Sequence, residues 1–239
     1  MKIFVPMIDP KEIIADIIKY KLQRVLVFYD NPHGCKWNGG RVTSSVNFLD
    51  NLRFYNSIGI PVFACFTNNV ININDELGNF YLSELAKFKG NGVIVLNRKL
   101  NQYIKEKYPT LIRTKTTIDT SDYDDYDLIV LKYDDAIKHN DKERIEVMLN
   151  HDCDIKNCWF YKNHYRCIAK CNRIFENPEK LKKCFQYCVT GIQTRKNYKI
   201  SELIKDGFTN FKLVGRGDNL KNLKKGIIDI CKDCLGIYD

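Results

Sequence analysis

The chain has 239 residues, of which 44% are hydrophobic and 28% are charged, and its formal net charge is +9. This length allows one large α/β domain or two small ones, and we expect one. No run of about 18 apolar residues is present, which excludes an ordinary membrane-spanning helix. The excess of lysine and arginine either allows contact with a polyanion such as RNA or is simply a solvated basic surface.

The first residues, from Met1 to Pro6, lack the apolar core and the small-residue cleavage site of a secretory signal peptide. We therefore expect a cytoplasmic protein. Because thiols stay reduced in that compartment, the ten cysteines are expected to act as ligands or as buried thiols rather than as disulfides.

Eight short apolar runs rich in β-branched residues recur along the chain. They are continuous rather than alternating, as expected for strands that are buried on both faces of a parallel sheet. Segments with helical periodicity separate several of them, and in the first such segment the isoleucines form one apolar stripe. The predicted strands are 3–5, 25–29, 61–66, 93–96, 111–114, 128–131, 145–149 and 211–214. The predicted helices are 10–21, 45–58, 80–88, 99–107 and 220–231.

Eight strands separated by helices predict a single (β/α)8 TIM-type barrel that spans residues 1–239. An open, doubly wound sheet is the alternative. A barrel of this kind takes about 250 residues, so this one is close to minimal in size. The loops that follow the strands of a barrel converge on one face, and we expect the functional residues there.

A Cys-rich insert of about residues 150–190 follows the seventh predicted strand. Six of the ten cysteines fall inside it, at Cys153, Cys158, Cys167, Cys171, Cys184 and Cys188. Their wide, irregular spacing fits the four thiolates of a 4Fe–4S cluster, because a fold can supply these from separate segments. A tetrahedral zinc site and inert buried thiols are the alternatives.

The other cysteines are interpreted more simply. Cys65 lies within an apolar strand and is expected to act as a small hydrophobe. Cys35 lies in a loop on the proposed active face, where it is either part of the site or a free surface thiol. Cys231 and Cys234 form the one C-x2-C pair, on the last predicted helix, and are expected to be partly buried thiols.

Two glycine–arginine motifs follow predicted strands. Gly215, Arg216 and Gly217 come directly after the last strand, where barrels often hold phosphate on backbone N–H groups and a helix N-terminus. The alternative is a tight turn in which Arg216 pairs with a carboxylate. Arg41, in Gly39-Gly40-Arg41, has the same two interpretations. No Ser-His-Asp arrangement, HExxH or P-loop is evident.

Residues 201–216 resemble a segment of the collagenase-like peptidase family U-32, in which a short helix and a glycine precede a strand that ends in Lys-Ile-x-Gly-Arg. Residues 150–164 are similar to a Cys-bearing loop of clostridial-type relatives. Residues 39–41 and 67–69 fall where such relatives carry glycine–arginine and asparagine motifs. Two departures are that Val214 stands where an acidic residue is common, and that an Arg-Gly-x-Cys block is missing.

The resemblance implies a barrel whose four cysteines hold an iron–sulfur cluster, and oxygen-independent hydroxylation of RNA bases or of the ubiquinone ring. The expected ligands are Cys153 and Cys158, with Cys184 and Cys188 preferred over the pair between them. Two rival functions are a zinc- or cluster-stabilised binding protein without catalysis, and the peptidase or hydrolase of the family's name. The expected site residues are Arg41 and Arg216 for an RNA or small anionic ligand, Gly215 and Gly217 beside the latter, and Asn68, Asn69 and His164 as hydrogen-bonding groups.

Overall fold

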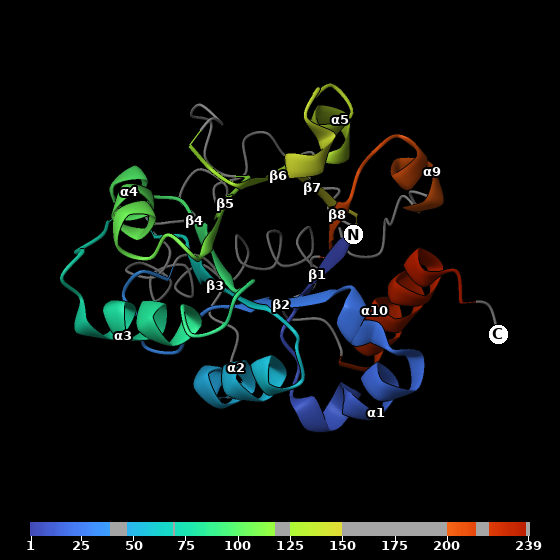
Figure 1. Ribbon diagram of the computed structural model, residues 1–239, viewed down its shortest axis with the longest axis horizontal. Coiled ribbons are helices and arrows are strands. Elements are labelled where there is room, and N and C mark those ends of the chain that lie inside the picture. Colours follow the sequence, from blue (N-terminus) through green and yellow to red (C-terminus); the bar gives the residue numbers. More distant parts are fainter. Residues whose placement is uncertain (39–46, 69, 118–124, 150–199, 214–219, 238–239) are drawn as a thin grey trace, which may run out of the picture.

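Eight parallel strands close into a barrel in the computed structural model of the protein (Figure 1). Each strand pairs with the next along the chain, and β8 pairs with β1 to close the ring. The predicted TIM-type barrel is therefore confirmed, and the open sheet is excluded. The structure describes residues 1–38, 47–68, 70–117, 125–149, 200–213 and 220–237, so the Cys-rich insert lies outside the described residues.

All eight predicted strands are present, with boundaries that lie within two residues of those expected. They are β1 Lys2–Pro6, β2 Leu26–Asp30, β3 Val62–Phe66, β4 Gly92–Val95, β5 Ile112–Lys115, β6 Leu128–Lys132, β7 Ile145–Met148 and β8 Asn210–Lys212. The described helices are α1 Pro10–Tyr20, α2 Phe48–Ser57, α3 Glu76–Leu85, α4 Arg98–Lys107, α5 Tyr133–Ala136, α9 Ile200–Lys205 and α10 Leu220–Leu235. Two 3₁₀ turns, Leu22–Arg24 and Lys142–Arg144, precede β2 and β7.

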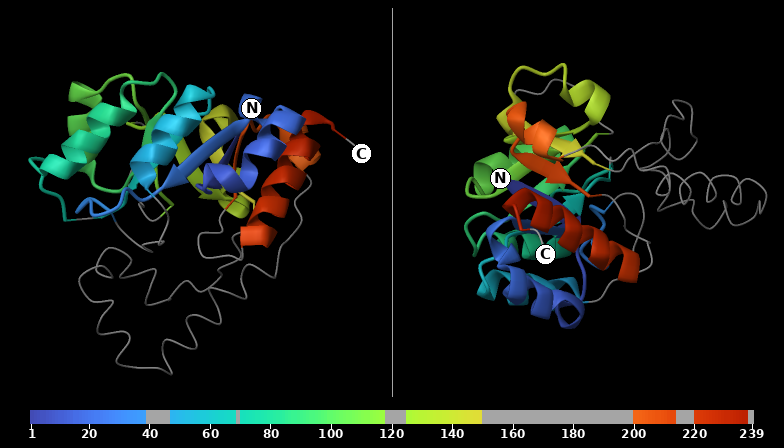
Figure 2. Two further views of the ribbon diagram at one scale, coloured as in Figure 1. Left: turned by 90° about the horizontal axis from the view of Figure 1, so that it is seen from below. Right: turned by 90° about the vertical axis from the view of Figure 1, so that its right-hand side faces the viewer.

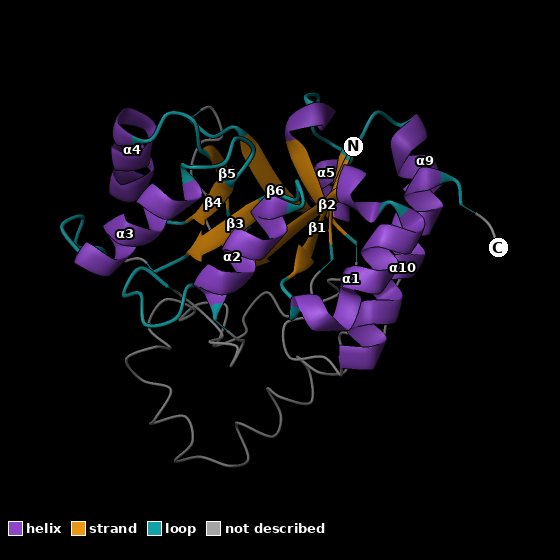
Figure 3. Cartoon of the chain, turned by 60° about the horizontal axis from the view of Figure 1, so that its bottom comes forward, coloured by secondary structure: helices purple, strands orange, loops and turns teal. Residues whose placement is uncertain are grey.

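The helices lie outside the ring of strands (Figures 1 and 3). The last helix, α10, lies beside α1, and Lys224 Nζ is 2.8 Å from Asp16 Oδ2 across this contact (Figure 2). The helix α3 begins at Glu76 rather than at the predicted residue 80. Its start is set by Asp75, whose Oδ1 accepts a hydrogen bond from the Gly78 N–H at 2.9 Å, which is an N-cap.

The strands bury side chains on both faces, which explains their continuous apolar sequence. The outward-facing side chains of the strands pack against the helices in two large clusters. The side chains that alternate with them point inward and fill the barrel. Inside the barrel, the rings of Phe4 and Phe63 meet edge to face with centroids 5.1 Å apart. Gly92 leaves room for this packing, since a Cβ there would lie 2.5 Å from Phe63 Cε1. The buried interior set consists of Phe4, Val27, Tyr29, Phe63, Cys65 and Ile94.

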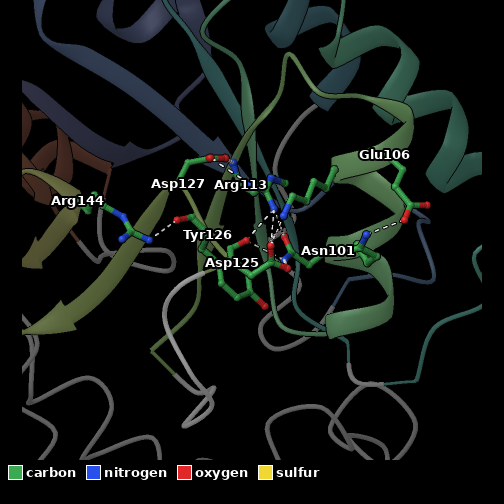
Figure 4. Close-up of polar contacts among 9 residues, drawn as sticks. Asn101, Glu106, Arg113, Asp125, Tyr126, Asp127 and Arg144 are labelled. Carbon is green, nitrogen blue, oxygen red and sulfur yellow. Dashed lines mark hydrogen bonds and ion pairs between the residues drawn. The ribbon is translucent and has the colours of Figure 1, made fainter.

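In the connection from β5 to β6, the structure describes residues 116–117 and 125–127, and none of these is helical. Arg113, on the outer side of β5, holds the end of this connection in place (Figure 4). Its Nη1 donates to the carbonyl oxygen of Asp125 at 2.7 Å, and its Nη2 lies 3.2 Å from Asp127 Oδ1. Arg144 Nη2 donates to the carbonyl oxygen of Tyr126 at 2.6 Å. Two arginines thus fix a strand connection that lacks a described helix.

Candidate functional site

The C-terminal residues of the eight strands lie at one end of the barrel, which we call the mouth. In barrels of this type, catalytic and binding residues come from the strand ends and loops on that side. Three of the strands end in lysine at the mouth: Lys212 ends β8, Lys132 ends β6 and Lys115 ends β5.

A buried ion pair lies beneath the mouth. Lys212 Nζ is 2.5 Å from Glu146 Oε1, and the side chains of the two residues are 8% and 0% exposed. Strand pairing explains how they meet. Glu146 is level with Asn210 and Met148 is level with Lys212, so the two charged residues are diagonal neighbours on the interior faces of β7 and β8. The lysine lies nearer to the mouth, with the glutamate below it.

Aromatic rings surround the ammonium group of this pair. Lys212 Nζ lies 4.1 Å from the ring centroid of Tyr29 and 5.8 Å from that of Phe4. Such positions over a ring face attract a cation. The Tyr29 hydroxyl donates to the carbonyl oxygen of Leu213 at 2.9 Å, which fixes its ring against β8. The lysine is therefore held by one carboxylate oxygen and by the aromatic faces of β1 and β2.

Inside the barrel, two buried side-chain oxygen atoms lack a hydrogen-bond partner among the described residues. They are Glu146 Oε2 and Thr114 Oγ1, the latter on the face of β5 that carries Ile112 into the barrel. Burial raises the pKa of the Glu146 carboxyl above its usual range, and Lys212 lowers it only in part. A carboxyl group in such surroundings holds a proton more readily than one in water.

Near the mouth, the loops after β2 and β3 are bound to each other. Trp37 is buried, its Nε1 donates to the carbonyl oxygen of Asn72 at 2.8 Å, and its ring meets Phe66 edge to face. Asn68 connects the same loops: its backbone N–H donates to Trp37 O at 3.0 Å, and its Nδ2 donates to Lys36 O at 2.9 Å. Asn68 Oδ1 accepts from the Val70 N–H at 3.0 Å. These bonds give Asn68 a positioning role in the loop, and its catalytic role stays a prediction.

The other predicted site residues lie outside the described residues and remain predictions. They are the cluster ligands Cys153, Cys158, Cys184 and Cys188, the anion-binding group Gly215, Arg216 and Gly217, and Arg41, Asn69 and His164. The structure does describe where the insert joins the barrel. The chain leaves β7 at Met148, at the mouth, and the next described element is α9.

The four described cysteines are free thiols. Cys35 is 5% exposed, so the alternative of a surface thiol is wrong. Burial raises the pKa of Cys35 to about 12 and that of Cys234 to about 12, and it raises the pKa of Cys231 as well. Cys65 is buried in the barrel, as expected for a small hydrophobe. Across the described part of the chain, no group of three or more His, Cys, Asp or Glu residues is placed to hold a metal ion.

Comparison with known proteins adds no relative: no family model matches the chain, and no curated protein matches it. The described residues contain no helix long and apolar enough to cross a membrane.

Sequence reasoning missed the pair of Glu146 and Lys212. The signal was a charged residue inside a run predicted to be buried on both faces: Glu146 interrupts Ile145 to Leu149, and Lys212 follows Phe211. A lone charge in such a strand needs a buried partner of opposite sign. Each of these two residues supplies that partner for the other.

Proposed function

We propose that the protein is an iron–sulfur barrel enzyme that takes part in oxygen-independent hydroxylation, or a related modification, of an RNA base or a small aromatic substrate. The supporting observation is the attachment point of the Cys-rich insert. It follows β7 at the mouth, and β7 and β8, which flank it in sequence, carry the buried pair Glu146 and Lys212. Metal-binding cysteines and a buried ion pair would then serve one end of the barrel.

The available donors fit a four-thiolate cluster. A thiol must lose its proton to bind a metal, and burial makes this harder by raising the pKa of the described thiols of Cys35, Cys231 and Cys234. The ligands are therefore expected among the six cysteines of the insert, with Cys153, Cys158, Cys184 and Cys188 preferred. When bound, a 4Fe–4S cluster would supply electron transfer or an open iron site.

The chain's own residues would bind and orient the substrate. Arg216 and Arg41 would bind a phosphate or carboxylate through the planar guanidinium fork, with Gly215 and Gly217 allowing close approach of the backbone. His164 and Asn69 would add neutral hydrogen bonds. Lys212, the member of the buried pair that lies nearer to the mouth, would supply a hydrogen-bond donor at the floor of the mouth.

Metal analysis of the full chain, purified without oxygen, tests this proposal. We expect a brown protein with about four iron and four acid-labile sulfide per chain, because a cubane cluster has that composition. A colourless protein with stoichiometric zinc would favour a zinc-stabilised binding protein instead, since zinc has no redox chemistry. Absence of both metals would refute the cluster and leave the hydrolase alternative.

A further inference from the structure

The buried pair beneath the mouth combines two features that a purely structural ion pair does not need. The two members differ in burial, because the side chain of Lys212 is 8% exposed while that of Glu146 is 0% exposed. Glu146 Oε2 has no partner among the described residues, although the side chain is fully buried.

We propose that Lys212 is a reactive amine that forms an imine with a small ketone or aldehyde entering through the mouth, and that Glu146 is its proton partner. This activity goes beyond the proposed cluster chemistry and does not depend on it. The ligand class follows from the groups present: an amine in an apolar site reacts with a carbonyl carbon, and only uncharged, compact groups suit a site lined by Phe4 and Tyr29.

The first requirement is an amine without its extra proton. Glu146 Oε1 lies 2.5 Å from Lys212 Nζ, so a proton moves between them without any change of geometry. In surroundings of low polarity, a neutral amine beside a neutral carboxylic acid avoids the cost of burying two charges. The raised pKa of the Glu146 carboxyl likewise favours a proton on Glu146. Glu146 therefore serves as the acceptor for the lysine proton.

The reaction balances with these two residues and the carbonyl compound alone. After the proton has passed to Glu146, the Nζ–C bond forms, and an N–H proton moves to the carbonyl oxygen to give a carbinolamine. The C–O bond then breaks, and the hydroxyl leaves as water with the proton returned by Glu146. The products are a protonated imine, a carboxylate and water. No electrons are gained or lost, and one positive charge still faces Glu146, so the electrostatic balance of the site is retained.

The competing explanation is that the pair only fills the interior of the barrel. A structural pair of this kind is expected to be inert towards carbonyl compounds, because its lysine remains a shielded ammonium ion. The two explanations differ in chemical reactivity at one lysine, which can be measured on the unaltered protein.

Reductive trapping on the full wild-type chain is the decisive experiment. The protein is incubated with acetone, an uncharged and compact ketone, and then with sodium borohydride, which supplies hydride and converts an imine into a stable secondary amine. Peptide mass spectrometry measures the modified fraction at each lysine. We expect at least about tenfold more at Lys212 than at Lys2, which begins β1 at the opposite end of the barrel. Equal labelling of the two, or an unmodified Lys212, overturns the proposal.

Two variants assign the roles. Glu146→Gln keeps the shape of the side chain but cannot accept the proton, so labelling of Lys212 is expected to fall at least about tenfold. Lys132→Met is the matched control, since it removes another lysine from a strand end and should leave labelling of Lys212 unchanged. Undiminished labelling in Glu146→Gln, with the protein folded by circular dichroism, would contradict the role of Glu146. Iron content, measured on the same samples, reports separately on the cluster.

Discussion

The carboxylate of Asp127 binds Arg113 twice: its Oδ2 accepts the backbone N–H of Arg113 at 2.8 Å, and its Oδ1 lies 3.2 Å from the guanidinium Nη2. The residue before β6 is thereby fixed to the second residue of β5. In most β/α units, an amphipathic helix covers the outer face of the strand and sets the position of the next one. Here the arginine side chain of β5, only 10% exposed, holds the residue that precedes β6 (Figure 4).

Replacing Arg113 with lysine should destabilise the protein. Lysine keeps the charge but loses the planar fork that reaches Asp125 O and Asp127 together. We expect the free energy of unfolding, measured with urea, to fall by about 1–3 kcal/mol, because the partly buried carbonyl oxygen of Asp125 and the half-exposed carboxylate of Asp127 lose a charged donor. Arg98→Lys, at the exposed first residue of α4, should change it by less than about 0.5 kcal/mol. Equal effects of both substitutions would contradict a special role for Arg113.

Gly78→Ala should destabilise the protein although it lies within a helix. Glycine to alanine in a helix usually stabilises by up to about 1 kcal/mol. In α3, however, a Cβ at Gly78 would lie 2.5 Å from Trp37 Cδ2, so the buried ring must move. We expect a loss of about 1–3 kcal/mol in the free energy of unfolding and a changed tryptophan emission spectrum. A stabilised variant with unchanged emission would show that Trp37 does not pack on α3.

Glu84→Gln should alter the dependence of stability on pH. The pKa of the Glu84 carboxyl is lowered by its hydrogen bonds, first from Lys87 and then from Arg53, whose Nη2 is 2.9 Å away. A lowered pKa in the folded state means that the carboxylate stabilises the protein at neutral pH, and that this contribution is lost as pH falls below the ordinary value of 4.5.

The wild type should therefore exceed the variant in free energy of unfolding by less than about 1 kcal/mol at neutral pH, since both cations are largely exposed. This difference should shrink as the pH falls below 4.5. Urea unfolding of both proteins across this range measures it. A difference that stays constant with pH would mean that the charge of Glu84 is not what stabilises the fold.

The double variant Cys153→Ser/Cys158→Ser should lose the metal. Four intervening residues allow one loop to bring both sulfurs to one site, and a cluster needs its thiolates close together. We expect iron content to fall to background in protein purified without oxygen. The matched control is Cys65→Ala, which removes a buried interior thiol and should retain iron. Full retention of iron in the double variant would exclude these two cysteines as ligands.

The strands could be predicted from the sequence because each is a continuous apolar run, as Leu128 to Leu131 illustrates. Helix ends were less predictable: α3 starts at its Asp75 cap, and the four-residue helix α5 has too few residues for a periodic pattern to show. The connection before β6 could not be predicted, because it depends on side-chain contacts of Arg113 rather than on periodicity.

The candidate site was less predictable still. Glu146 and Lys212 are far apart in the sequence and meet only through the register of β7 and β8, which no local pattern specifies. Asn68 was singled out correctly as a residue of the mouth loops, yet its described bonds go to backbone groups of Lys36, Trp37 and Val70. Residue type and loop position therefore predicted which loop Asn68 lies in, but they did not predict its hydrogen-bond partners.

Anomalous diffraction at the iron absorption edge, from crystals of the full chain grown without oxygen, tests most directly whether a cluster serves the mouth of the barrel. We predict one iron peak beyond the C-terminal ends of β7 and β8, on the side of Met148 and Leu213 and above the Lys212 and Glu146 pair. A peak at the opposite end of the barrel, a signal only at the zinc edge, or no metal signal would contradict the account.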